Sequence, residues 1–160
     1  MMITIKDLIY ALTCLSFSII VGAAVYEHLA VWPRAYAAPP LSLSMFQGEY
    51  GLNSGAFWTK IHPVTLLLFI TTLILFWKSA RRKTILIVFI GYIVVMVTTF
   101  LYFVPELIDI TTTEYTTAID ESLRSRGALW EKLSLLRLAV ITGLAIVLYF
   151  GASKTEGVNN

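Results

Sequence analysis

The stretch that decides the fold is residues 64–97, which read VTLLLFITTLILFWKSARRKTILIVFIGYIVVMV. Two almost continuous apolar runs, 64–76 and 85–97, flank a short basic segment. An apolar run of about 20 residues is long enough to cross the hydrocarbon core of a bilayer, which is about 30 Å thick. Strands of a membrane barrel would instead alternate polar and apolar residues. The runs therefore predict membrane-spanning helices, which satisfy their own backbone hydrogen bonds in lipid.

The rest of the chain extends this pattern to four spans. The sequence has 160 residues, of which 58% are hydrophobic and 14% are charged, whereas soluble proteins carry about 25% charged residues. We predict an all-α protein, a four-transmembrane-helix bundle formed by one domain over residues 1–153, with a polar tail at 154–160. The predicted spans are residues 7–31, 58–77, 85–104 and 133–150. No proline occurs from 118 to 150, so the fourth helix is expected to begin outside the membrane.

The basic segment sets the predicted orientation. Residues 78–83 contain four lysines and arginines and no acid, which is typical of a cytoplasmic loop. With four spans, both termini are then cytoplasmic, in agreement with Lys6 and Lys154. The first apolar run, about 25 residues long, exceeds a signal-peptide core of about 7–15 residues, so we expect a retained helix. The sequence predicts an integral multi-pass protein of a bacterial-type plasma membrane.

Composition excludes several classes of function. A net charge of +2 gives no reason to expect nucleic acid as a partner. The single cysteine, Cys14, has no second cysteine to pair with and is expected to pack as an apolar residue. Nucleophile-elbow, phosphate-loop and haem-attachment motifs are absent from the sequence, so hydrolase, nucleotide-binding and c-type haem functions have no support.

Most ionisable side chains within or beside the spans fall at the predicted outer end. A charge at mid-depth in a bilayer costs about 2.5–3.5 kcal/mol, so such residues are functional-site candidates. Trp130, Ser134, Arg137 and Ile141 share one helix face, because they are spaced four, three and four residues apart. Arg137 lies deepest and requires a partner, for which Glu27 or Glu106 is the natural choice. The candidate polar pocket consists of Glu27, His28, His62, Glu106 and Arg137.

This cluster has more than one interpretation. Two imidazoles and two carboxylates are possible metal ligands, and any metal site would use His28, His62, Glu27 and Glu106. The Glu-x-x-His pairs of di-iron bundles are missing, so no metal site is expected. An ion pair between Arg137 and a glutamate, which would only hold the helices together, explains the cluster as well as ligand binding does. His62, followed by Pro63, is expected at a helix start. Residues 32–57 form either a lid or a plain linker.

The arrangement resembles the anthrone oxygenase-like family of small four-helix membrane proteins. The features concerned are small residues in the first helix ahead of a long outer loop, Val104-Pro105-Glu106 at the end of the third helix, and Trp130-x-x-x-Ser134-x-x-Arg137 in the fourth. Ser134 stands where the family pattern has Asn or a similar amide. The resemblance implies a four-helix bundle and, for some fungal members, oxygenation of polycyclic anthrones to quinones without a metal or flavin cofactor.

These observations lead to two main hypotheses for function. In the first, the protein is a cofactor-independent oxygenase for an apolar aromatic molecule, with His28 or His62 as general base and Arg137 stabilising the enolate-like anion. Glu27, Glu106, Trp130 and Ser134 would bind the substrate. In the second, it is a non-catalytic membrane binding or accessory protein with a structural polar cluster. A metal-dependent membrane oxidase is a third alternative. The expected partners are the lipid bilayer, an apolar small molecule and, in a homo-oligomer, further copies.

Overall fold

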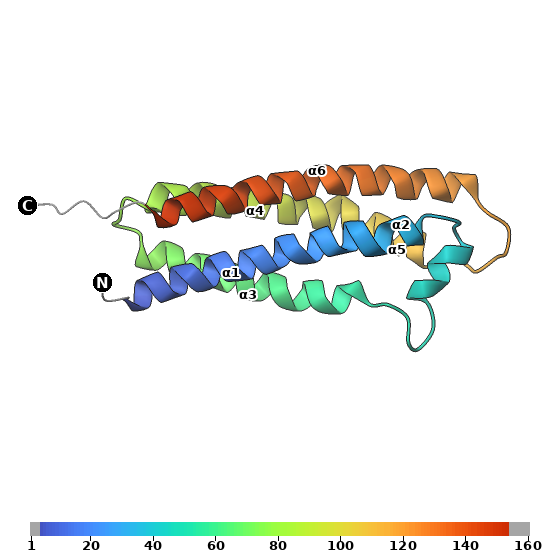
Figure 1. The fold of residues 1–160 in the computed structure, drawn as a ribbon, viewed down its shortest axis with the longest axis horizontal. Helices are drawn as coiled ribbons and strands as arrows, with labels where there is room; N and C mark the ends of the chain where they lie inside the picture. The colour runs from blue at the N-terminus through green and yellow to red at the C-terminus, as the bar shows by residue number, and fades with distance from the viewer. Residues whose placement is uncertain (1–3, 154–160) are drawn as a thin grey trace, which may run out of the picture.

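Four long helices lie side by side in a computed structural model that describes residues 4–153 (Figure 1). Helix makes up 81% of the structure, and no strand occurs in its described part. Four helical stretches are long and apolar enough to cross a membrane, namely Ile5–Ala35, Ser54–Leu75, Arg82–Thr111 and Glu121–Ala152. These findings confirm the predicted all-α fold with four apolar helices. Lys154 and the polar tail lie outside the described residues.

In chain order the helical segments are α1 (Ile5–Tyr26), η1 (Glu27–Val31), α2 (Trp32–Ala35), η2 (Leu41–Phe46), α3 (Ser54–Leu75), α4 (Arg82–Thr98), η3 (Thr99–Phe103), α5 (Val104–Thr111) and α6 (Glu121–Ala152). The short segment η2 lies between the first two long stretches. Helix α6 has 32 residues and is therefore about 48 Å long. It begins well before residue 133, as expected for a fourth helix that starts outside the membrane.

Pro105 does not end the third helical stretch, which continues past the end of the predicted span at residue 104 to Thr111. The π-helical segment η3 follows α4, and in it the Val104 N–H bonds to the Thr99 carbonyl, five residues back. Pro105 then occupies the first turn of α5, where the absence of an N–H is tolerated. The first span likewise continues beyond residue 31, through π-helical η1 and α2.

The second long helix begins at Ser54, before the predicted span, and this changes the position of His62. Asn53 caps α3 by accepting a hydrogen bond from the Ala56 N–H at 3.1 Å. His62 and Pro63 consequently lie inside α3, more than two turns from its first residue, and not at a helix start. Their expected role as boundary residues was wrong.

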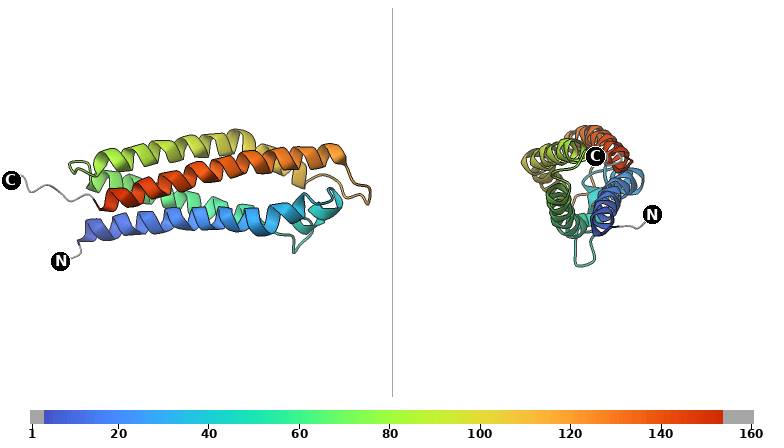
Figure 2. Two further views of the ribbon diagram at one scale, coloured as in Figure 1. Left: turned by 45° about the horizontal axis from the view of Figure 1, so that its top comes forward. Right: turned by 90° about the vertical axis from the view of Figure 1, so that its left-hand side faces the viewer.

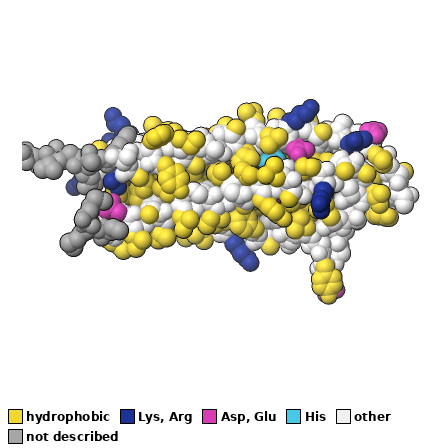
Figure 3. Space-filling view, in the orientation of Figure 1, with side chains coloured by type: hydrophobic (Ala, Val, Ile, Leu, Met, Phe, Trp, Pro, Cys, Tyr) yellow, Lys and Arg dark blue, Asp and Glu magenta, His cyan; other side chains and the backbone are white. Residues whose placement is uncertain are grey.

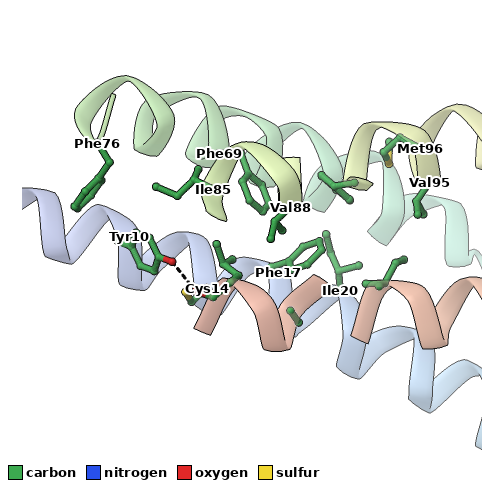
Figure 4. Packing of buried hydrophobic residues seen from close by; sticks show 14 residues of the cluster. Tyr10, Cys14, Phe17, Ile20, Phe69, Phe76, Ile85, Val88, Val95 and Met96 are labelled. Atoms are coloured by element: carbon green, nitrogen blue, oxygen red, sulfur yellow. Dashed lines mark hydrogen bonds between the residues drawn. The ribbon is translucent and has the colours of Figure 1, made fainter. Parts of the chain in front are cut away.

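The half of the bundle in which α1 begins and α6 ends, here called the terminal half, has a filled core. Figure 2 shows that the start of α1, the end of α6 and the loop between α3 and α4 lie at the same end. Figure 4 shows Phe17 of α1 and Phe69 of α3 among the buried side chains. Two hydroxyl pairs, Ser16–Thr65 at 2.6 Å and Thr13–Thr72 at 2.7 Å, join the same two helices. Such contacts stabilise helix pairs in membranes.

The opposite half, here called the loop half, contains the two longer connections. Its core is aromatic: Trp32 packs edge-on against Trp130, with ring centroids 4.8 Å apart, and also stacks on Tyr36. Gly127 of α6 makes room for Tyr36, because a Cβ at position 127 would overlap the tyrosine ring. Arg126 of α6 forms ion pairs with Glu106 and Asp109 of α5 and so links the two helices.

The surface agrees with a protein that crosses a bilayer. In the face shown in Figure 3, most charged side chains lie towards the two ends, and hydrophobic or uncharged side chains cover most of the length between them. Many large apolar side chains on the helices are exposed, including Leu67, Leu101 and Phe150. Exposure of this kind along all four spans is expected where lipid is the solvent.

Candidate functional site

The loop half contains a cavity of about 890 Å³. Its walls come from all four long helical stretches and from the loop that precedes α3. This volume lies within the range of about 300–1,000 Å³ that is usual for small-molecule sites. Most of the lining is apolar or aromatic, and the side chains that bring polar atoms from the helices include Glu27, His62, Thr99, Ser134 and Arg137.

Arg137 provides the cationic group of the cavity wall. Its guanidinium donates hydrogen bonds to Thr99 Oγ1 at 3.0 Å and to Ser134 Oγ at 2.8 Å. The guanidinium carbon also lies 4.1 Å from the centre of the Phe103 ring, in the geometry of a cation–π contact. No carboxylate in the described part of the chain is within ion-pair distance of Arg137. Glu106 pairs with Arg126 instead, so its expected pairing with Arg137 is wrong. Glu27 interacts electrostatically with Arg137 but is not in direct contact with it.

His62 faces the same cavity from α3. Its Nδ1 lies 2.6 Å from the hydroxyl of Tyr92 on α4, and its ring stacks on Trp58 with centroids 5.3 Å apart. The side chain of Tyr92 is fully buried. Because Tyr92 occupies Nδ1, Nε2 is the imidazole nitrogen left for a ligand. An imidazole with one nitrogen fixed by a hydrogen bond has a defined orientation, as a general base requires.

Glu27 lies on a third wall, in the π-helical segment η1. Its Oε1 accepts a hydrogen bond from Trp58 Nε1 at 3.0 Å. Trp58 therefore touches both polar groups on its side of the cavity, since it also stacks on His62. Ser54, at the start of α3, forms a further side-chain hydrogen bond with the Glu27 carboxylate. An acid, an imidazole and a guanidinium thus line one largely apolar space.

Two of the predicted site residues lie elsewhere. His28 is buried and does not line the cavity; its Nδ1 has no hydrogen-bond partner in the structure. Glu106 binds Arg126, with Oε1 2.9 Å from Nε, and Asp109 binds the same arginine at 2.6 Å. The sequence placed both residues at the correct end of the bundle. It could not show which way their side chains point.

The possible metal ligands do not come together. Among the residues that the structure describes, no three His, Cys, Asp or Glu side chains form a group that could hold a metal ion. Glu27 and His62 face the cavity, while His28 and Glu106 do not line it. The proposed four-ligand set His28, His62, Glu27 and Glu106 is therefore not assembled.

The predicted face of the fourth helix lines the cavity as a unit. Trp130, Ser134, Arg137 and Ile141 all contribute to its wall. Trp130 is almost fully buried and donates from Nε1 to the Phe103 carbonyl at 2.9 Å, so it is a core residue and not an exposed interfacial one.

Sequence reasoning missed two residues of the site, Tyr92 and Thr99. Both carry a hydroxyl inside a long apolar run. A buried tyrosine hydroxyl usually has a hydrogen-bond partner, and this signal was available without a structure. The partners themselves, His62 and Arg137, were not evident from spacing.

Comparisons with protein-family models, with curated proteins and with solved structures found no match for this chain.

Proposed function

We propose that this protein is a multi-pass membrane enzyme that oxidises an apolar aromatic molecule in the cavity of the loop half. The observation that carries the proposal is the convergence of His62 and Arg137 on one mainly apolar cavity of about 890 Å³. A flat aromatic ring system would contact the apolar and aromatic wall, and an acidic C–H or O–H of the same molecule would meet the polar groups. The family resemblance suggests the same substrate class.

The chemistry follows from the polar groups. His62 accepts a proton from the substrate at Nε2, while Tyr92 holds Nδ1. Arg137 stabilises the enolate-like oxygen, because a fixed guanidinium in a cavity of low polarity favours the anion over the neutral substrate. Dioxygen is the oxidant: a methylene carbon between two aromatic rings becomes a carbonyl, with one oxygen atom entering the product and the other leaving as water. The proposal requires no metal or flavin.

The test is turnover of a hydroxylated anthrone by the purified protein in lipid nanodiscs under air. Quinone absorbance and oxygen consumption should rise together. His62→Ala and Arg137→Ala should each lower the rate by about 100-fold or more, as expected when a general base or an oxyanion-stabilising group is lost. Thr71→Val is the control, since Thr71 is exposed on α3 and bonds only to the Leu67 carbonyl. Unchanged turnover in both site variants would rule out this mechanism.

A second candidate is a non-catalytic membrane binding or accessory protein. The observation in its favour is that Arg137 already bonds to Thr99 and Ser134, so the arginine can hold η3 against α6 without any ligand. This function predicts that Arg137→Ala lowers the thermal stability of the protein in detergent. It also predicts that no aromatic compound raises that stability.

We further propose that both termini face the cytoplasm of a bacterial-type cell and that the cavity lies towards the outer surface. The basic loop at 78–83 supports this orientation. In intact cells, a membrane-impermeant maleimide should label Glu49→Cys and should not label Lys78→Cys. Cys14 is buried and contributes little background. The reverse labelling pattern would show that the basic loop faces outward and would contradict the proposed orientation.

A further inference from the structure

We infer that the cavity opens sideways into the bilayer, between α3 and the η3–α5 segment, and takes up a membrane-dissolved phenol that carries a hydrocarbon chain. This inference rests on the proposed function for the acidic oxygen of the ligand, and it adds the route of entry and the chain.

The two sides of the opening are not joined by polar or aromatic contacts. The hydrogen bond between His62 and Tyr92 links α3 to α4, and the rings of Phe69 and Phe89 also meet across this pair. Farther towards the loop end, no hydrogen bond, ion pair or ring contact connects α3 with η3 or α5 in the residues described here. Side chains of both segments line the cavity instead.

Several lining residues on these two sides also have large exposed fractions. Phe100 is 61% exposed and Ile108 is 55% exposed, and both contribute to the cavity wall. On α3, Thr59 and Pro63 are exposed lining residues as well. Residues that face both the cavity and the surroundings mark the rim of an opening, and this rim is largely apolar.

The depth of the rim places it in the hydrocarbon. Helix α3 has 22 residues and is therefore about 33 Å long, close to the thickness of a bilayer core. Pro63 is the tenth of these residues, so it lies near the middle of the helix. Phe100 is eleven residues before the end of the third span at Thr111, a comparable distance from the loop end. A molecule entering between them comes from lipid and not from water.

The polar groups inside identify the head of that molecule. Arg137 has no carboxylate partner at ion-pair distance in the described structure, so it can bond to the oxygen of an acidic head group. Glu27 and His62 can each accept a proton or a hydrogen bond. A phenolic hydroxyl meets both needs, because its oxygen accepts from Arg137 while its proton is donated to His62 or Glu27. The hydrocarbon chain would pass through the apolar rim beside Phe100.

The experiment measures uptake of 3-pentadecylphenol by the protein in nanodiscs, without any turnover. Phe100→Cys in a Cys14→Ala background is labelled with a bulky pyrene maleimide to block the opening. Leu101→Cys, labelled in the same way, is the matched control, because Leu101 is 77% exposed and does not line the cavity. Labelled Phe100→Cys should take up the probe at least tenfold more slowly than labelled Leu101→Cys. Phenol without a chain should bind at least tenfold more weakly.

Three outcomes would overturn the inference. Equal uptake by the two labelled variants would show that the ligand enters elsewhere, for instance beside the loop that precedes α3. Equal binding of phenol and the chain-bearing probe would show that the hydrocarbon chain contributes nothing to recognition. An absence of saturable probe binding by the unlabelled protein would show that the cavity does not bind alkylphenols. Saturable binding of the probe through the opening, in a protein that does not oxidise a hydroxylated anthrone, would instead keep this inference and contradict the proposed oxygenase.

Discussion

The two halves of the bundle are formed by the same four long helical stretches but differ inside. The terminal half has a packed core, and the loop half contains a cavity. In the terminal half, rings from three helices meet, with the Phe17 ring 5.4 Å from Phe69 and 5.1 Å from Tyr92. In the loop half, the helices surround a cavity, and the two π-helical segments, η1 and η3, occur there. Glu27 lies in one π segment and Thr99 in the other. In the loop half, the π-helical segments contribute Glu27 and Thr99 to the candidate site, while the regular helices α3 and α6 contribute His62 and Arg137.

This comparison agrees with a general property of π-helical turns. An extra residue in one turn shifts the following side chains around the helix axis, and such turns occur frequently at functional sites. Here Glu27, which bonds to Trp58, is the first residue of η1, and Thr99, which bonds to Arg137, is the first residue of η3. The stability of the protein should therefore depend mainly on the terminal half, and ligand binding mainly on the loop half.

The largest expected effect is the loss of a ring from the terminal core. Phe17→Ala should lower the free energy of unfolding by about 3 kcal/mol, because a buried phenylalanine leaves a cavity that its neighbours fill only in part. Leu15→Ala is the control on the same helix, since Leu15 is 56% exposed and should cost less than about 1 kcal/mol. Reversible unfolding in mixed micelles gives both values. Similar losses for the two variants would contradict the assignment of stability to the terminal core.

A smaller effect is expected at the aromatic core of the loop half. Gly127→Ala places a Cβ in the volume of the Tyr36 ring, and overpacking of this kind costs about 1–3 kcal/mol. Gly143→Ala is the matched control in α6, because no atom lies within 4 Å of the added Cβ. The control should leave the melting temperature unchanged or raise it. If both variants melt alike, Tyr36 is free to move and the loop half is looser than described.

The third prediction tests whether the hydrogen bond from Arg137 to Thr99 of η3 positions the guanidinium for ligand binding. Thr99→Val removes one hydrogen bond to Arg137 and should weaken binding of a hydroxylated anthrone by roughly tenfold, which corresponds to about 1.4 kcal/mol. Thr98→Val is the control: Thr98 is the neighbouring residue and bonds only to the Val95 carbonyl. Tryptophan fluorescence titration in nanodiscs measures both affinities. Equal affinities would mean that Thr99 does not position the guanidinium.

The sequence predicted the fold better than it predicted the site. Apolar runs and the basic loop at 78–83 located four helices, because in lipid a spanning segment has few alternatives to helix. The helices extend beyond the predicted span limits at residues 58 and 104 for local reasons. Asn53 caps α3 earlier, and η3 carries the helix past Pro105.

The site was harder to predict because it depends on contacts between helices. The spacing in α6 placed Trp130, Ser134 and Arg137 on one face, and the structure places all three in the cavity wall. Spacing within one helix cannot show that Tyr92 meets His62 across two helices. The same limit explains why Glu106 was assigned to Arg137, although it pairs with Arg126.

The central claim is that the loop half contains a ligand site built around Arg137 and His62. Equilibrium binding of a hydroxylated anthrone to the protein in nanodiscs tests it most directly, with Arg137→Gln and His62→Ala as variants and Thr71→Val as the control. We predict one saturable site per chain, unchanged in Thr71→Val and weakened by at least tenfold in both site variants. Binding that does not saturate, or that is equally strong in all four proteins, would contradict the account.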